Sequence, residues 1–175
     1  MKTIVVYKSK YGSTKAYAEW IADAIGCEAV EVSKTNVEEL SQYDTIIYGG
    51  GLYAEMIAGI NVIIKNIDKF KDKKLIVFTT GITPLNCREY YDKLVVEKNF
   101  KGDIYNKIKM FNYPGKMILS ELTFVHRTAI KTLKKIMSEK KNPTEMEKLL
   151  IELFDADGDF SDRTLINELV EYAKG

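Results

Sequence analysis

A repeated alternation of short apolar runs with segments of helical spacing constrains this chain most. Five runs rich in β-branched and other apolar residues predict strands buried on both faces, at residues 2–7, 28–32, 45–48, 74–80 and 107–111. Apolar residues at helical spacing predict helices at about residues 17–25, 36–41, 60–67, 88–98 and 162–174. This order predicts an α/β fold, an open doubly wound parallel sheet with right-handed crossovers and helices on both faces.

Length and composition predict one globular domain spanning residues 1–175. Hydrophobic residues make up 46% of the chain and charged residues 29%, as in ordinary folded proteins. A formal net charge of +1 argues against bulk nucleic-acid binding. The first residues lead straight into a strand without a signal-peptide pattern, which favours a cytoplasmic location. Cys27 and Cys87 form no CxxC pair, so neither a disulfide framework nor a metal cluster is expected.

After Gly115 the alternation stops, and a mostly helical insertion is predicted at about residues 113–158. Its first half, residues 122–141, reads as a basic amphipathic helix. The apolar stripe comprises Val125, Ala129, Leu133, Ile136 and Met137, and the basic face comprises Arg127, Lys131, Lys134 and Lys135. Such a helix is either a solvated face over a packed one or a peripheral contact with an anionic membrane. Asn142, Pro143 and Glu145 predict the start of a second helix there.

Three loops rich in glycine and hydroxyl groups follow the first, third and fourth predicted strands. They cover residues 9–14, 49–55 and 80–86. In an open parallel sheet, ligands bind beyond the carboxyl ends of the strands. We therefore expect these loops to form a single site.

The first of these loops, S-K-Y-G-S-T at residues 9–14, predicts an anion site. A helix amino terminus presents free N–H groups and the positive end of its dipole, so a phosphate is a natural occupant. The sequence lacks the G-x-x-x-x-G-K-[ST] pattern and has no G-x-G-x-x-G after the first strand, which disfavours nucleoside triphosphates and ordinary dinucleotides. The alternative is a polar turn that only caps the helix.

This loop resembles the phosphate loop of flavodoxins, [ST]-x-T-G-x-T, with Tyr11 in the place of the Thr that precedes the Gly. The two later loops fall where flavodoxins place their isoalloxazine contacts, and the resemblance extends over essentially the whole chain. It implies a flavodoxin-like five-stranded sheet of order 2-1-3-4-5 and the cofactor flavin mononucleotide (FMN). The cofactor-binding residues it implies are Ser9, Lys10, Tyr11, Gly12, Ser13, Thr14, Gly50, Gly51, Leu52, Tyr53, Ala54, Thr80, Gly81, Ile82 and Thr83.

Within this family, the Y-G-x-T form of the loop resembles the quinone-linked protoporphyrinogen IX dehydrogenases. F-N-Y-P-G-K-M-I-L-S at residues 111–120, the basic helix after it and the acidic return D-G-D-F-S-D at residues 157–162 are similar to the same branch. Residues 49–55 lack the Arg-Tyr-Gly tail associated with those enzymes. The branch implies a porphyrinogen and a quinone as substrates. A flavodoxin-type electron carrier, another FMN-dependent reductase and a non-redox interaction module are the alternatives.

Two features favour an enzyme over a carrier. The third loop, residues 82–86, has no aromatic residue, so one flavin face is expected to stay accessible to a flat substrate. The net charge of +1 also does not suit a carrier, because carrier flavodoxins are generally acidic. Tyr53 is the aromatic expected to pack on the ring, unless it is an exposed surface tyrosine.

Other candidate sites are weaker. D-A-D-G-D-F-S-D at residues 155–162 resembles a calcium loop, but Asp162 stands at the position that needs glycine, so no metal is predicted. His126 is interpreted as a surface residue that begins a helix rather than as a general base. No protein side chain is assigned as catalytic, because the chemistry would take place on the flavin.

Overall fold

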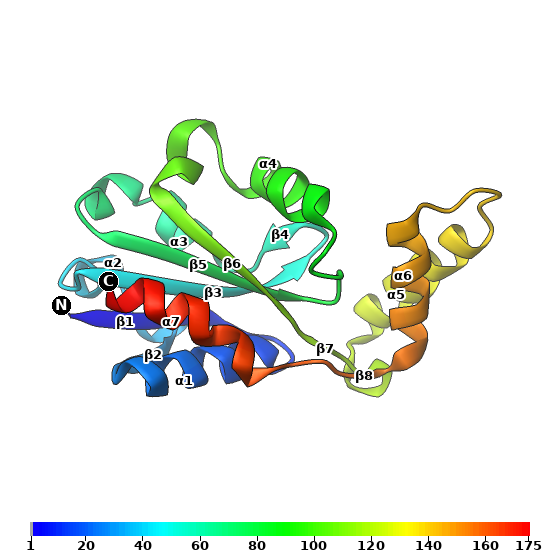
Figure 1. Cartoon of the computed structure of the whole chain (residues 1–175), viewed down its shortest axis with the longest axis horizontal. Coiled ribbons are helices and arrows are strands. Elements are labelled where there is room, and N and C mark those ends of the chain that lie inside the picture. Colours follow the sequence, from blue (N-terminus) through cyan, green and yellow to red (C-terminus); the bar gives the residue numbers. More distant parts are fainter. Residues whose placement is uncertain (1) are drawn as a thin grey trace.

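The computed structural model describes residues 2–175, and its centre is a sheet of five parallel strands (Figure 1). The strand order is β2-β1-β3-β5-β6, and the short strand β4 pairs antiparallel with the end of β3. The bounds are Thr3–Lys8 for β1, Glu28–Glu31 for β2, Thr45–Tyr53 for β3, Met56–Ile57 for β4, Lys74–Gly81 for β5 and Ile108–Pro114 for β6. The predicted doubly wound fold is confirmed. So is the order 2-1-3-4-5, once β4 is set aside.

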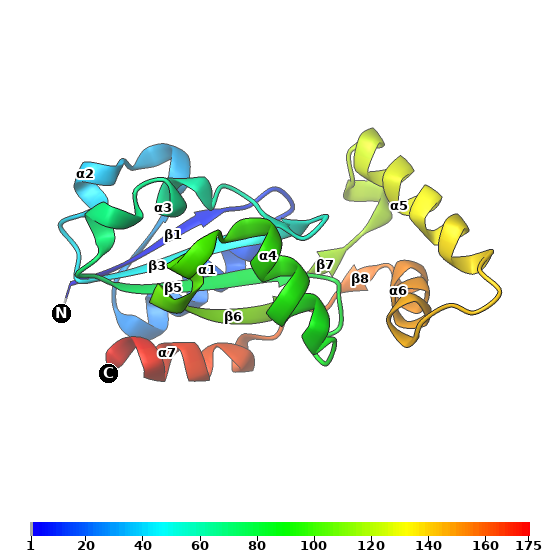
Figure 2. The ribbon, with the colours of Figure 1, turned by 90° about the horizontal axis from the view of Figure 1, so that it is seen from above.

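Helices cover both faces of the sheet (Figures 1 and 2). One face carries α1 (Ser13–Ile25) and α7 (Asn167–Lys174), and the other carries α2 (Val37–Leu40), α3 (Asn61–Ile64) and α4 (Val96–Asn99). Neighbouring strand residues point to opposite faces, so Val5 packs in the core on the α1 side and Val6 in the core on the other side. Burial on both faces explains why these strands read as continuous apolar runs.

Several predicted helices are shorter or less regular than their patterns indicated. The segment predicted at 60–67 contains only one turn of α-helix, α3. The segment predicted at 88–98 contains a π-helix, Tyr90–Val95, which is followed by α4. Short 3₁₀ segments occur at Val32–Lys34, Ile67–Phe70, Gly102–Lys107, Leu119–Glu121 and Arg163–Ile166. Helix α1 ends as predicted at Gly26, which has a left-handed backbone and donates its N–H to the Ala22 carbonyl at 2.8 Å.

The triple glycine at residues 49–51 belongs to strand β3, which corrects its prediction as part of a loop. Its role is close packing, since a Cβ atom on Gly49 would lie 2.1 Å from Cζ of Phe78. Phe78 comes from the neighbouring strand β5, and its ring occupies the space that any side chain at position 49 would need. The glycine run thus lets an aromatic residue pack directly against the strand.

A helical hairpin projects from the carboxyl edge of the sheet (Figures 1 and 2). It consists of α5 (Phe124–Ser138) and α6 (Glu145–Ala156), and it is joined to the sheet through a two-stranded neck of β7 (Lys116–Met117) and β8 (Gly158–Asp159). Its own small core contains Met117, Leu122, Met137 and Phe154, and the partly buried Tyr11 and Ile82 pack against that core. The hairpin therefore lies against the first and third loops.

The start of α6 differs from its prediction by two residues. Thr144 caps the helix, accepting a hydrogen bond from the Glu147 N–H at 3.2 Å. The Glu147 carboxylate in turn accepts one from the Thr144 N–H at 2.8 Å, which completes a capping box. The sequence predicted a capping box formed by Asn142 and Glu145. The observed box is formed by Thr144 and Glu147, which have the same spacing and bond each other's backbone N–H groups.

Candidate functional site

The loop after β1 leads into an open helix end. Gly12 occupies the cap position of α1 with a φ of 100°, no side chain caps the helix, and its first turn contains no acidic residue. Within the loop, the Gly12 N–H donates to Ser9 Oγ at 3.2 Å. The positive end of the α1 dipole thus meets no internal anion, which is the condition for binding an external one.

The hydroxyl groups of this loop hold neighbouring segments in place. Ser13 Oγ accepts a hydrogen bond from the Lys116 N–H at 2.9 Å, across 103 residues of sequence. Thr14 is buried, and its Oγ1 lies 2.7 Å from Oγ1 of Thr80 at the end of β5. These two bonds fix the neck and the third loop against the start of α1.

A small cavity of about 60 Å³ lies where the three loops meet. Its lining includes eight residues that the flavodoxin resemblance implied, namely Ser9, Tyr11, Ser13, Thr14, Gly51, Tyr53, Thr80 and Gly81. Gly115 and Lys116 complete it, and neither was among the cofactor-binding residues that the resemblance implied. The loops therefore converge on one place, with the neck as a fourth wall.

The other implied residues lie around this cavity or farther from it. Lys10 is exposed, with its Nζ 5.6 Å from the Tyr11 ring centroid. Gly50 packs tightly against Ile57, and Ala54 has a positive φ of 47° at the end of β3. The remaining implied residues are Gly12, Leu52, Ile82 and Thr83. Of these, Ile82 and Thr83 line a second cavity.

His126 lies in the first turn of α5, as expected, and from there it contacts Tyr11 of the first loop. Its Nδ1 atom is 2.6 Å from the Tyr11 hydroxyl, and the side chain is partly buried. Thr123, which caps α5, lies against the same hydroxyl, with its N–H donating to Tyr11 Oη at 3.4 Å. The contact joins residues 115 apart, so no local pattern could have predicted it.

Tyr11, Tyr53 and His126 form an aromatic cluster, and its two tyrosines line the small cavity. Ring centroids are 6.3 Å apart for Tyr11 and Tyr53, and 5.3 Å apart for Tyr53 and His126. Burial, with a smaller contribution from Tyr11, raises the pKa of Tyr53 to about 12, so its phenol is protonated near neutral pH. Burial and the charge of Lys10 lower the pKa of His126, which favours the neutral imidazole.

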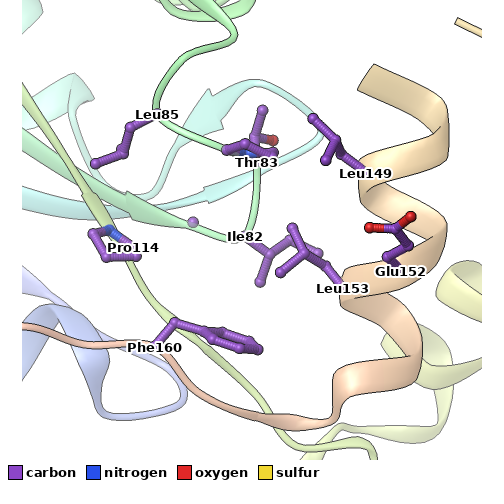
Figure 3. A pocket seen from close by; sticks show the side chains of 10 residues that line it. Ile82, Thr83, Leu85, Pro114, Leu149, Glu152, Leu153 and Phe160 are labelled. Atoms are coloured by element: carbon purple, nitrogen blue, oxygen red, sulfur yellow. The ribbon is translucent and has the colours of Figure 1, made fainter. Parts of the chain in front are cut away.

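A larger cavity of about 320 Å³ lies between the third loop and α6. Figure 3 shows Leu149, Glu152 and Leu153 of α6 facing Ile82 and Thr83, with Phe160 below them. The complete lining is Gly81, Ile82, Thr83, Pro84, Leu85, Pro114, Leu149, Glu152, Leu153 and Phe160. Because Gly81 borders both cavities, they are neighbours across the end of β5.

Comparison with known sequences identifies the family. Residues 4–146, from β1 to the start of α6, match the family model described as a flavodoxin domain. The chain belongs to the flavodoxin domain family.

Several known proteins resemble this flavodoxin domain at low sequence identity. An uncharacterized protein of Methanocaldococcus jannaschii is 28% identical over 105 residues, covering 58% of this chain and 69% of that protein. Among solved structures, a flavodoxin from the domain Archaea is 16% identical with a TM-score of 0.38, covering 89% of this chain and 98% of its own. The two-electron reduced flavodoxin of Megasphaera elsdenii is 20% identical with a TM-score of 0.40, covering 63% and 82%.

The described part of this flavodoxin domain, residues 2–175, offers no group of three or more His, Cys, Asp or Glu side chains placed to hold a metal ion. Within the same residues, no helix has the length and apolar character needed to cross a bilayer. Both cysteines in that range, Cys27 and Cys87, are free thiols.

Proposed function

We propose that this flavodoxin domain is a redox protein that binds FMN, with the phosphate at residues 9–14 and the ring near residues 50–54 and 80–83. The observation that carries the proposal is the open amino terminus of α1, which has no side-chain cap and no acidic residue in its first turn, beside a cavity that extends to Tyr53 and Gly81. The residues present fit an anionic, ring-bearing ligand. When bound, the flavin supplies the electron-transfer chemistry, and the protein orients the flavin and controls its surroundings.

We further propose an oxidoreductase of the protoporphyrinogen IX dehydrogenase (quinone) type. The larger cavity supports an enzyme, because it offers space for a second molecule beside the aromatic-free third loop. Tyr91 steadies this loop by donating its hydroxyl hydrogen to the Thr83 carbonyl at 2.6 Å. Apart from Thr83 and Glu152 the cavity is lined by apolar side chains and glycine, a surface suited to a flat, uncharged ring such as a quinone.

An electron carrier or another FMN-dependent reductase is the alternative function, and family membership alone favours it. A carrier needs the flavin edge exposed to a protein partner, but it does not need the larger cavity. The two functions differ in what reduces and oxidises the bound flavin.

The first test is the visible spectrum of the purified protein, followed by identification of any released flavin. FMN at one equivalent supports the cofactor assignment, and failure to bind added FMN contradicts it. Anaerobic mixing with protoporphyrinogen IX and then a ubiquinone analogue tests the enzyme. Bleaching of the flavin band by the first and its recovery with the second are expected. A flavin reduced only by a protein donor would support the carrier instead.

We also propose that α5 contacts an anionic membrane surface. Of the two alternatives for this helix, a stripe packed inside is met only at Met137, since Val125 is 71% exposed and Ile136 is 53% exposed. Phe124 at the start of the helix is 82% exposed, and Lys131 and Lys135, farther along the same helix, are exposed as well. Exposed apolar side chains flanked by lysines complement a bilayer with acidic headgroups.

A further inference from the structure

We infer that Lys116 supplies the cation that binds the flavin phosphate, an inference that rests on the proposed function. Lys116 belongs to β7 in the neck, so it reaches the site from the hairpin rather than from the three loops. Its backbone N–H donates to Ser13 Oγ, which places the residue against the first position of α1. Its side chain then passes over Gly12, with Cε and Nζ each 3.8 Å from the point where a Cβ atom of Gly12 would lie.

The partner of Lys116 in this structure is a carboxylate that a phosphate can replace. Its Nζ lies 2.6 Å from Oε2 of Glu121, and the Lys116 side chain is 21% exposed. An ammonium group has three donors, so one anion does not exhaust it. A phosphate at the amino terminus of α1 would bind this ammonium group together with Glu121 or in its place. The phosphate would then accept a charge-assisted hydrogen bond from Lys116 in addition to those from the helix N–H groups.

Other lysines near the loop are placed differently. Lys10 extends over the Tyr11 ring, and Lys15, in the first turn of α1, is 55% exposed and pairs with Glu19 at 3.7 Å. Lys15 therefore provides a matched control: it is also a lysine near the start of α1, but its charge is directed toward Glu19.

Dissociation constants of FMN and of riboflavin, which lacks the phosphate, test the inference through quenching of flavin fluorescence. In Lys116→Met the FMN constant is expected to rise by about tenfold or more, as for the loss of a hydrogen bond to a charged group, while riboflavin binding changes by less than about twofold. Lys116→Arg should retain most of the FMN affinity. Lys15→Met should change FMN binding by less than about threefold, because exposed charges are screened. Glu121→Gln should leave FMN binding equal or tighter.

Three results would overturn the inference. The first is that Lys116→Met weakens the binding of FMN and riboflavin equally, and the second is that it does not weaken FMN binding at all. The third is that Lys15→Met weakens FMN binding as much as Lys116→Met does. Circular dichroism melting shows whether each variant is folded. If Lys116→Met is unfolded, Lys116→Arg tests whether a positive charge at this position is enough for FMN binding. A parent protein that binds neither flavin would instead refute the proposed function itself, and the inference with it.

Discussion

The Tyr11 hydroxyl lies 2.6 Å from Nδ1 of His126, which ties the loop after β1 to the first turn of α5. Burial and the charge of Lys10 lower the pKa of His126, so the folded protein favours the neutral imidazole, and the contact with Tyr11 is a hydrogen bond between a phenol and a neutral ring. The Tyr11 oxygen meanwhile accepts from the Thr123 N–H. One phenol therefore links the predicted phosphate loop to the hairpin.

Removing either member of this pair should have the same effect. Tyr11→Phe and His126→Asn are each expected to lower the free energy of unfolding by about 1 kcal/mol, the usual contribution of one hydrogen bond. The double variant should lose little more than either single one, because both remove the same bond. Urea denaturation of all four proteins measures this, with Tyr172→Phe on the surface as the control. Additive losses would show that the two residues act separately.

Acidification should loosen the same contact. The folded protein lowers the pKa of His126, so the unfolded chain binds the extra proton first as the pH falls through about 6.5, the ordinary histidine value. The contribution to stability is complete above that pH and is lost below it. Melting temperatures at pH 7.5 and pH 5.5 should therefore differ more in the parent than in His126→Asn. Equal differences would assign the acid sensitivity to other groups.

Asn99 should be a main anchor of the second loop. Its buried side chain accepts a hydrogen bond from the Ile57 N–H at 2.8 Å and donates to the carbonyls of Glu55 and Val95 at 2.6 and 2.8 Å. Asn99→Ala leaves these groups without a partner, so we expect a loss of about 2 to 3 kcal/mol in urea unfolding. Asn66→Ala, which removes a single partly buried bond to the Val62 carbonyl, should lose less and serves as the control. Equal losses would contradict this role.

Filling the larger cavity should separate substrate access from cofactor binding. Leu153→Trp places a ring between α6 and the third loop, and it is expected to slow flavin reoxidation by a ubiquinone analogue by about tenfold or more, since the acceptor loses its position. FMN affinity should stay within about twofold, as in the surface control Leu165→Trp. If FMN affinity fell instead, the cavity would be part of the flavin site.

Membrane contact through α5 predicts binding that depends on charge. The parent should float with vesicles of acidic phospholipid at low salt and not at high salt. Lys131→Glu with Lys135→Glu should reduce binding by at least about tenfold, because each lysine near such a surface contributes about 1 kcal/mol. Lys98→Glu on α4 is the control. The proposal would be contradicted if flotation stayed the same at high salt and in the double variant, or if the protein bound equally well to neutral vesicles.

The sequence predicted the sheet well because its signals are local. A strand buried on both faces must be a continuous apolar run, and Gly26 ends α1 through its own backbone geometry. The packing role of residues 49–51 could not be predicted from their own segment, because the need for glycine there comes from Phe78 on another strand. The placement of Lys116 and His126 depends on how the hairpin docks on the sheet, and no periodicity within one segment encodes that contact.

The neck brings Lys116 and Met117 directly beside Asp159 and Gly158, so the chain leaves the sheet and returns at almost the same point. The hairpin is therefore topologically an appendage. A family with this architecture can lengthen, shorten or exchange the hairpin by genetic insertion or deletion without changing the order of a single strand in the sheet. What such a change would alter is the side of the small cavity that the neck provides through Gly115 and Lys116.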